Sequence, residues 1–178
     1  MVYAHDTEEA LTAATWLVNS AGPPDELTTV EALQAFLDDF GYSGRRDGDT
    51  AELAAVRAIR PHLRALLLAE RDEAVSLVNT TLARATAVPR LVRHDHLDWH
   101  IHAIDDESPL AERMQVETAM AMIDVIRADD HSRISVCADE TCEGVVLDLS
   151  RNRSKKFCST TCGNRNAVAA YRARQADG

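Results

Sequence analysis

The chain has 178 residues, of which 46% are hydrophobic and 27% are charged, and its 29 acidic and 19 basic residues give a formal net charge of −10. These values are typical of a globular protein with one domain or one domain plus a small module, and no apolar run reaches the ~20 residues that a membrane span requires. The first 20 residues have no basic start and no separate apolar stretch, so we expect no secretory signal and a cytoplasmic location.

The sequence begins with amphipathic helical patterns. A first helix is predicted before Pro23 and Pro24, which interrupt the pattern. Thr28 and Glu31 have the spacing of a capping box for a second helix, whose apolar stripe ends at Gly41. We therefore expect two helices within the first 41 residues.

Two further helical stretches follow a polar loop. Asp49 and Glu52 predict the start of a third helix, and Pro61 is expected to kink or divide it. A fourth helix is predicted from Asp72. The first half of the chain is thus expected to be almost entirely helical.

The pattern changes to period two between residues 88 and 103. Residues 88–93 and 97–103 are predicted to pair as a hairpin, because apolar and polar residues alternate in the second segment. We expect Trp99 and Ile101 to face the protein and the polar residues to face water. These polar residues could form a metal-binding, haem-binding or proton-sensing patch, or only a solvated face; they are His94, His96, Asp98, His100 and His102.

A long helix is predicted to begin at Ser108 and Pro109, and it is apolar nearly all round, so we expect it to be the most buried element. Residues 129–135 are predicted to form a short hinge. The hinge divides the chain into a helical body, residues 1–130, and a cysteine module, residues 131–178. Because the hinge is short, we expect the two parts to pack against each other.

All four cysteines lie in the cysteine module, as Cys137, Cys142, Cys158 and Cys162. Two close pairs separated by an insert of 15 residues suit a tetrahedral zinc ion bound by four thiolates. An iron–sulfur cluster uses the same ligand type, and four free thiols or a redox pair would also account for four clustered cysteines. Neither pair has the C-x-x-C spacing of a thioredoxin-like site. The spacing therefore favours one structural zinc ion.

The insert between the cysteine pairs contains strand-like residues from Val145 to Leu149, a polar turn and a return through Phe157. The second pair opens a final helix. This order predicts a treble-clef-like finger with a hairpin between the two pairs and a helix after them. Val168 and Tyr171 are expected to pack against the hairpin.

Charge is distributed unevenly: residues 151–178 contain seven of the basic residues and only one acidic residue. Such a basic segment on an acidic body predicts an anionic partner, although a merely solvated helix would have the same composition. Nucleic-acid contacts are predicted at the hairpin tip and on the final helix, for the side chains of Arg151, Arg153, Lys155, Lys156, Asn164, Arg165, Arg172 and Arg174.

Residues 136–175 resemble the CGNR zinc finger family. The shared features are the two cysteine pairs, the string DLSRNRS, the aromatic residue before the third cysteine, the string CGNR at residues 162–165 and the ending AAYRAR. Such fingers usually follow an N-terminal ABATE domain in proteins described as putative stress-induced transcription regulators, and the strings LVNS and LDWHIHA are compatible with that domain. The resemblance implies DNA binding by the finger, with sensing or dimerisation by the body.

The sequence contains no serine elbow, phosphate-binding glycine loop or HxxEH-type motif, so we expect no enzymatic activity. The predicted fold is mainly α (α+β): a helical body with a short β-hairpin, followed by a treble-clef-like finger. The predicted function is a zinc-containing, DNA-binding transcription regulator. The sequence is also compatible with a protein-interaction adaptor or an RNA-binding accessory factor. A homodimer or partner regulator and a small-molecule effector are compatible with the first function.

Overall fold

The computed structural model describes residues 2–93 and 98–176. In these residues the body contains α1 (His5–Asn19), α2 (Val30–Asp39), α3 (Thr50–Ala58), α4 (Arg60–Leu68), α5 (Arg71–Arg84), β1 (Arg90–Val92), β2 (His100–His102) and α6 (Leu110–Arg127). The 3₁₀-helix η1 (His131–Arg133), β3 (Ile134–Val136), β4 (Val145–Leu147) and α7 (Thr160–Ala176) follow. The predicted fold class, mainly helical with a four-cysteine module containing a hairpin and a helix, is confirmed.

Side-chain caps fix the starts of α2 and α3. Thr29, not the predicted Thr28, is the N-cap of α2, and its hydroxyl accepts a hydrogen bond from the Ala32 amide at 3.2 Å. The cap lies one residue later because the backbone of Thr29 is still extended and its hydroxyl reaches the third amide of the helix. Asp49 caps α3 as predicted and accepts from the Glu52 amide at 2.8 Å.

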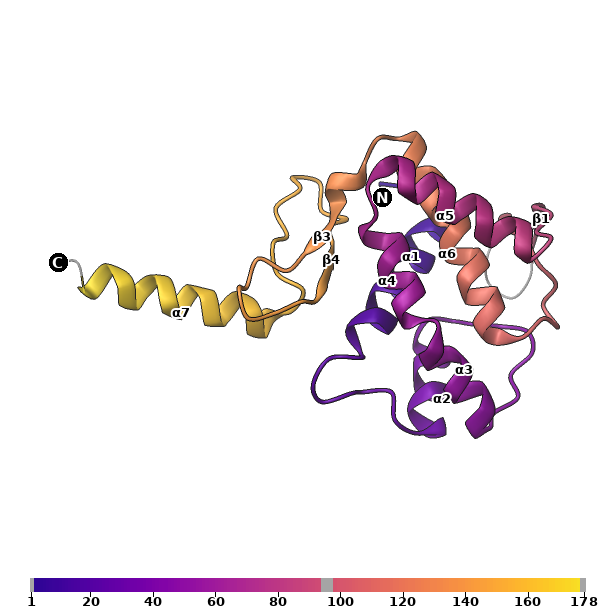
Figure 1. Ribbon diagram of the computed structural model, residues 1–178, viewed down its shortest axis with the longest axis horizontal. Coiled ribbons are helices and arrows are strands. Elements are labelled where there is room, and N and C mark those ends of the chain that lie inside the picture. Colours follow the sequence, from indigo (N-terminus) through magenta and orange to yellow (C-terminus); the bar gives the residue numbers. More distant parts are fainter. Residues whose placement is uncertain (1, 94–97, 177–178) are drawn as a thin grey trace.

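Helix α6 is the central element of the body. Nine of its side chains are buried, and it packs between α1 and α5 (Figure 1). Pro61 lies in the first turn of α4 and marks the break between α3 and α4, as predicted. The prediction that the segment after Pro109 is the most buried helix is confirmed, and this helix packs against α1, α3, α4 and α5.

The hairpin of β1 and β2 forms as predicted, with Leu91 opposite Ile101 in antiparallel register. The predicted orientation is wrong: Trp99 and Ile101 are 63% and 43% exposed, whereas His100 and His102 are partly buried. The hairpin lies on the body through its polar face, where the Ile101 amide donates to Asp6 at 3.1 Å. Alternation alone shows that two faces differ, but not which of them contacts the body.

The cysteine module packs against the body, as the short hinge predicted. Strand β4 lies beside α1, and Val145 and Leu147 are buried with the core of the body. The side chain of Asn19 forms hydrogen bonds with both the amide and the carbonyl group of Val145. The division between residues 130 and 131 stays a prediction.

Strand β4 pairs with β3 in antiparallel register, with Val136 opposite Val145. The hairpin therefore encloses the first cysteine pair, and the prediction that it lies between the two pairs is wrong. The returning segment forms no strand in the described residues; the Ala138 amide donates to the Lys156 carbonyl group at 2.9 Å. Strand β3 precedes the first cysteine, in a segment for which the sequence predicts only a hinge.

Helix α7 projects away from the rest of the molecule (Figure 1). Val168 and Tyr171 are 49% and 58% exposed, so the prediction that they pack against the hairpin is wrong. Among the residues of α7 whose burial the structure describes, only Cys162, at the base of the helix, is buried. In the described part of the chain, no helix is long and apolar enough to cross a membrane.

Candidate metal centre and nucleic-acid interface

The first cysteine pair lies in a tight turn between β3 and β4. The Cys137 amide donates to the Gly144 carbonyl group at 2.7 Å, and the Cys142 amide donates to the Asp139 carbonyl group at 2.9 Å. The Gly144 amide points at the Cys142 sulfur atom, 3.3 Å away. A β-carbon on Gly144 would lie 2.7 Å from the Sγ atom of Cys158, so only glycine fits at this position without displacing a ligand.

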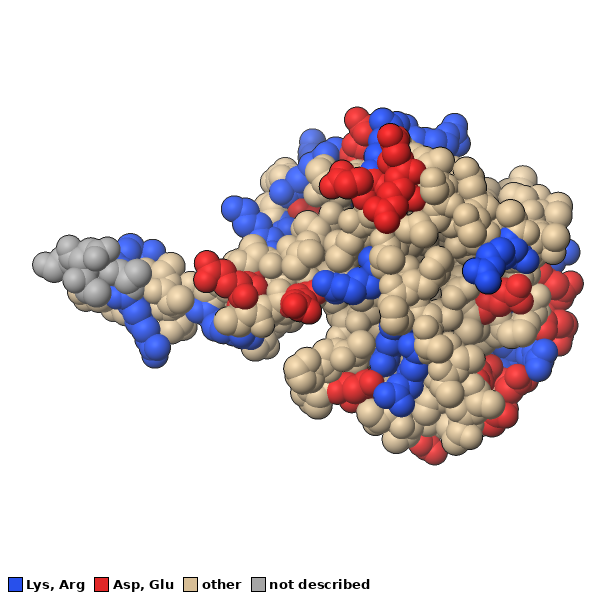
Figure 2. All heavy atoms as spheres, in the orientation of Figure 1, with Lys and Arg blue, Asp and Glu red and all other residues tan. Residues whose placement is uncertain are grey.

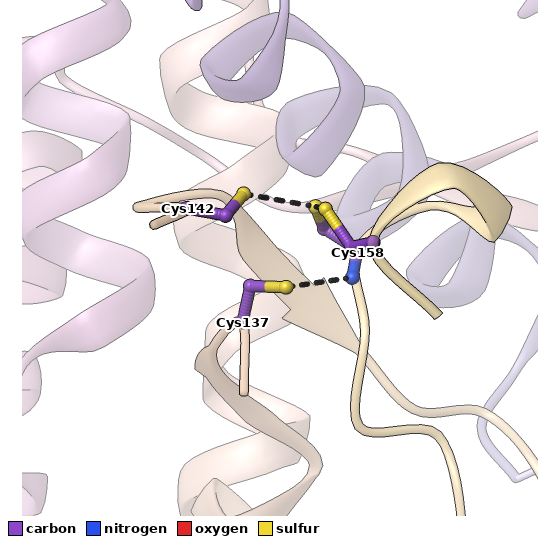
Figure 3. A group of neighbouring side chains, drawn as sticks. Cys137, Cys142 and Cys158 are labelled. Carbon is purple, nitrogen blue, oxygen red and sulfur yellow. Dashed lines mark hydrogen bonds between the residues drawn. The ribbon is translucent and has the colours of Figure 1, made fainter. Parts of the chain in front are cut away.

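The second pair lies at the start of α7. The Ser159 hydroxyl accepts a hydrogen bond from the Cys162 amide at 3.2 Å, which places Cys162 in the first turn of the helix. The Cys158 amide donates to the Cys137 sulfur atom at 3.4 Å and links the two pairs (Figure 3). Backbone amides directed at sulfur atoms stabilise thiolates.

The four sulfur atoms fit a tetrahedral zinc ion. They all lie within 4.8 Å of one another, and the sulfur atoms of Cys158 and Cys162 are 3.8 Å apart. The sulfur atoms of Cys142 and Cys158 are separated by 3.5 Å (Figure 3). Four thiolates at Zn–S distances of ~2.3 Å would lie about 3.8 Å apart. The cysteines can therefore hold one structural zinc ion, with Cys137, Cys142, Cys158 and Cys162 as the ligands.

The thiols of the cluster differ in their acidity. Burial acts to raise the pKa of Cys137, but hydrogen bonds from backbone amides, including that of Cys158, outweigh it and lower this pKa. Burial and the neighbouring sulfur atoms raise the pKa of Cys158 far above its usual range. Four thiolates this close would repel one another, so a divalent cation is needed to hold them all deprotonated.

Arg165 is held at the metal centre. Its guanidinium group donates to the Thr141 hydroxyl at 2.5 Å and lies 3.3 Å from the Asp139 carboxylate. Hydrogen bonds from the hydroxyl and the amide of Thr141 in turn hold the pKa of Asp139 below its usual range. One of the predicted nucleic-acid contacts thus also connects α7 to the turn that carries the first cysteine pair.

Arg153 also has a partner within the protein. Its guanidinium group donates to the Asp130 carboxylate at 2.6 Å and to the Ser132 hydroxyl at 2.9 Å. Asp130 also accepts from Arg133 at 3.0 Å and from the Tyr3 hydroxyl at 3.1 Å. Arg153 therefore connects the segment between β4 and α7 to the end of the body, in addition to any contact with a nucleic acid.

The remaining predicted basic residues lie on two exposed segments. One is the basic loop, defined as residues 150–156, in which Arg151, Lys155 and Lys156 are exposed; the other is α7, with Arg172 and Arg174 exposed near its outer end. Figure 2 shows blue side chains on the module and along the projecting helix, with red ones near the base of that helix. The positive surface is thus divided into patches.

The predicted histidine patch is only partly within the described residues. His100 and His102 lie side by side, with their Nε2 atoms 3.1 Å apart. Asp98 contributes its backbone carbonyl group, which accepts from His100 Nδ1 at 2.8 Å. His94 and His96 lie outside the described residues.

Two important residues were not predicted from the sequence. Asn19 anchors β4, and Gly144 leaves space for the sulfur atoms. A glycine two residues after a cysteine in a short turn is a recognisable signal for the second role. No sequence signal could have identified the first, because Asn19 and Val145 are 126 residues apart.

Comparison with known families agrees with this arrangement. Residues 11–129 match the ABATE family model, described as "Putative stress-induced transcription regulator". Residues 133–175 match the model of the CGNR zinc finger. No curated protein matches the chain.

Proposed function

The chain belongs to the ABATE family of putative stress-induced transcription regulators, and on this premise we propose that it regulates transcription by binding DNA through its zinc-containing cysteine module. The observation that carries this proposal is the position of α7. Its first turn supplies a metal ligand, while the rest of the helix is exposed and carries basic residues. A metal-held helix that projects from a body suits insertion into a groove or contact along a phosphate backbone.

Arg172 and Arg174 are the principal predicted phosphate contacts of α7. They lie beyond the acidic residues at the base of the helix, where a polyanion can approach without repulsion. Alanine at residues 167, 169 and 170 leaves that part of the helix narrow, so its backbone can come close to a groove wall. Arg172 and Arg174, rather than Arg165, are expected to supply most of the contact energy from the helix.

The basic loop provides a second contact region. Arg151, Lys155 and Lys156 are exposed, and the Lys155 amide donates to the Asp148 carboxylate at 2.8 Å. That bond, together with the one from the Ser150 amide to the same carboxylate, fixes the loop at both ends. The lysines are thus presented on an ordered loop rather than on a loose tail.

The test is binding of the zinc-loaded full chain to a pool of duplex DNA fragments, measured by fluorescence anisotropy at several salt concentrations. The double substitution Arg172→Ala and Arg174→Ala should weaken binding strongly and lower the slope of log K against log salt by about 0.9 for each phosphate contact removed. The matched control is Arg84→Ala with Arg127→Ala, which removes the same charge from exposed positions of the body. Equal losses in both double variants would refute the proposed interface.

A protein-interaction adaptor is the second candidate, and the exposure of Val168 and Tyr171 favours it. Exposed aromatic and aliphatic side chains on one helix are typical of protein interfaces. Capture of one protein partner that survives nuclease treatment and requires Tyr171 would support this candidate. A preference for RNA over duplex DNA in the anisotropy assay would support the third, an RNA-binding accessory factor.

Recognition of a single genomic site requires more contacts than one small module offers. The proposal therefore includes a homodimer or a partner regulator. It also includes a regulatory rather than enzymatic role and action in the cytoplasm. An effector of the body is part of the same proposal. Sedimentation of the protein with and without bound DNA would test the dimer.

A further inference from the structure

Two histidines of the body form a pair that the proposed DNA-binding role does not use. His100 and His102 lie on the same face of β2, and their Nε2 atoms are 3.1 Å apart. Both side chains line a small cavity of about 90 Å³, together with Glu9, Glu117 and Arg113. The pair is therefore accessible to an ion or a small molecule inside the cavity.

The second ring nitrogen of each histidine has a defined hydrogen-bond acceptor. His100 Nδ1 lies 2.8 Å from the backbone carbonyl oxygen of Asp98, and His102 Nδ1 lies 2.8 Å from a carboxylate oxygen of Asp106. A carbonyl or carboxylate oxygen only accepts, so both Nδ1 atoms must carry the proton. The 3.1 Å contact between the two Nε2 atoms is itself a hydrogen bond, in which the Nε2–H group of one ring donates to the Nε2 lone pair of the other.

We propose that His100 and His102 bind one divalent transition-metal ion through their Nε2 atoms, at a site separate from the four cysteines. Two nitrogen ligands at ~2.1 Å from one ion, at angles between octahedral and tetrahedral, lie about 3.0–3.4 Å apart. The observed separation of 3.1 Å falls within this range. The ion would replace the proton that the two Nε2 atoms share, and that proton would be released to the solvent.

The groups behind the ring nitrogens match those of known metal-binding histidines. Such ligands donate their other N–H group to a carboxylate or a backbone carbonyl, which fixes the ring and raises its basicity. His102 uses the carboxylate of Asp106 and His100 uses the carbonyl group of Asp98. Asp106 is thus a positioning residue for the proposed ion, acting through His102.

The cavity provides a suitable electrostatic environment. Glu9 and Glu117 line it, and Asp106 lies beside His102, so three carboxyl groups and one guanidinium group surround the site. This composition favours a cation over an anion. In the described residues no third side chain completes the ligand set, since the only cluster of three or more potential ligands there is the cysteine site. Water or a small ligand in the cavity would occupy the remaining coordination positions.

Nickel is the appropriate probe, because imidazole binds Ni²⁺ well and the thiolate site is already filled in zinc-loaded protein. The zinc-loaded full chain is titrated with Ni²⁺ by calorimetry near pH 7.5, and zinc content is measured before and after. We expect one Ni²⁺ per chain with no release of zinc. The Asp106→Asn substitution should weaken nickel binding roughly 10–100-fold, and His100→Gln with His102→Gln should abolish it.

The matched control is His5→Gln, which removes an exposed histidine of α1 and should leave nickel binding unchanged. The absence of any nickel binding would overturn the proposal and would mean that a shared proton, not a metal, joins the two rings. Nickel binding that survives the double substitution would overturn it as well. If circular dichroism shows that the double variant is unfolded, Asp106→Asn decides: undiminished affinity in that variant refutes the site.

Discussion

The side-chain amide of Asn19 pairs with the backbone of Val145 in the way that a neighbouring strand would. Asn19 Nδ2 donates to the Val145 carbonyl oxygen at 2.8 Å, and the Val145 amide donates to Asn19 Oδ1 at 2.7 Å. The last residue of α1 thereby satisfies both polar groups of the first residue of β4. This pair of hydrogen bonds joins the helical body to the cysteine module.

Replacing Asn19 with alanine should loosen that junction. Both backbone groups of Val145 would lose their partner, which costs about 1–3 kcal/mol for a buried polar group. We expect a lower melting temperature and faster hydrogen exchange of the amides in residues 145–147. Asn79→Ala, at an exposed position of α5, serves as the control. If the two variants exchange at the same rate in β4, the pairing with Val145 does not stabilise the junction.

Removing zinc with a chelator at neutral pH should unfold much of the cysteine module. Its core consists of little more than Cys137, Val146, Phe157 and the other three cysteines, which is too small to be stable without the metal. Helical ellipticity should fall, and proteolysis should begin within residues 150–176 while the helical body stays resistant. Unchanged ellipticity and unchanged proteolysis after chelation would contradict a structural role for the metal.

The Gly144→Ala substitution should weaken zinc binding. The added β-carbon would lie 2.7 Å from Cys158 Sγ and 3.3 Å from Cys142 Sγ, so at least one ligand must move. Competition with a chromogenic chelator measures the loss of affinity. Gly163→Ala is the matched control, because its β-carbon would meet only the ring of Phe157 at an ordinary distance of 3.6 Å. Equal zinc affinity in the two variants would show that the turn has room for a side chain.

Arg165→Ala and Arg172→Ala should have different consequences. Arg165 contacts Asp139 and Thr141 at the metal centre, so its loss should lower both the stability of the zinc-loaded module and DNA affinity. Arg172 is exposed on α7, so its loss should reduce DNA affinity alone. Thermal unfolding of the zinc-loaded protein, followed in parallel with anisotropy, separates the two effects. An unchanged melting temperature in Arg165→Ala would mean that its contacts at the metal centre are not stabilising.

Glu117 should make the stability of the body depend on pH. Burial raises the pKa of Glu117 from 4.5 to about 7. Between these two values the folded protein holds a proton that the unfolded chain has lost, so the free energy of unfolding falls as the pH rises through this window and levels off above it. Glutamine cannot ionise, so the Glu117→Gln variant should not lose stability as the pH rises. At pH 8 its free energy of unfolding should exceed that of the unmodified protein by on the order of 1–3 kcal/mol.

The control for the pH experiment is Glu73→Gln, at an exposed position of α5. Urea unfolding at pH 4.5 and at pH 8 gives the two free energies for each protein. The difference between Glu117→Gln and the unmodified protein should be larger at pH 8 than at pH 4.5. A difference that is the same at both pH values would show that folding does not shift the pKa of Glu117.

The sequence predicted those features that depend on local spacing. The two cysteine pairs, the cap at Asp49 and the break at Pro61 are each determined by residues within a few positions of one another. The face of the hairpin that contacts the body could not be predicted, because it depends on the contact between Asp6 and Ile101, which are 95 residues apart. Likewise, the partner of β4 and the anchoring of Arg153 by Asp130 depend on contacts between separate elements, which periodicity does not reveal.

The exposure of α7 has a thermodynamic consequence. Beyond its first turn, no buried side chain stabilises the helix in the described residues, so its helicity depends on alanine content and on the arginines near its C-terminal end, whose charge interacts favourably with the helix dipole. With 17 residues, α7 is only slightly longer than the ~12–15 residues below which isolated helices are marginally stable in water. A polyanion that contacts the helical form would therefore shift a helix–coil equilibrium by mass action, and its affinity for the protein would depend on temperature through the melting of α7.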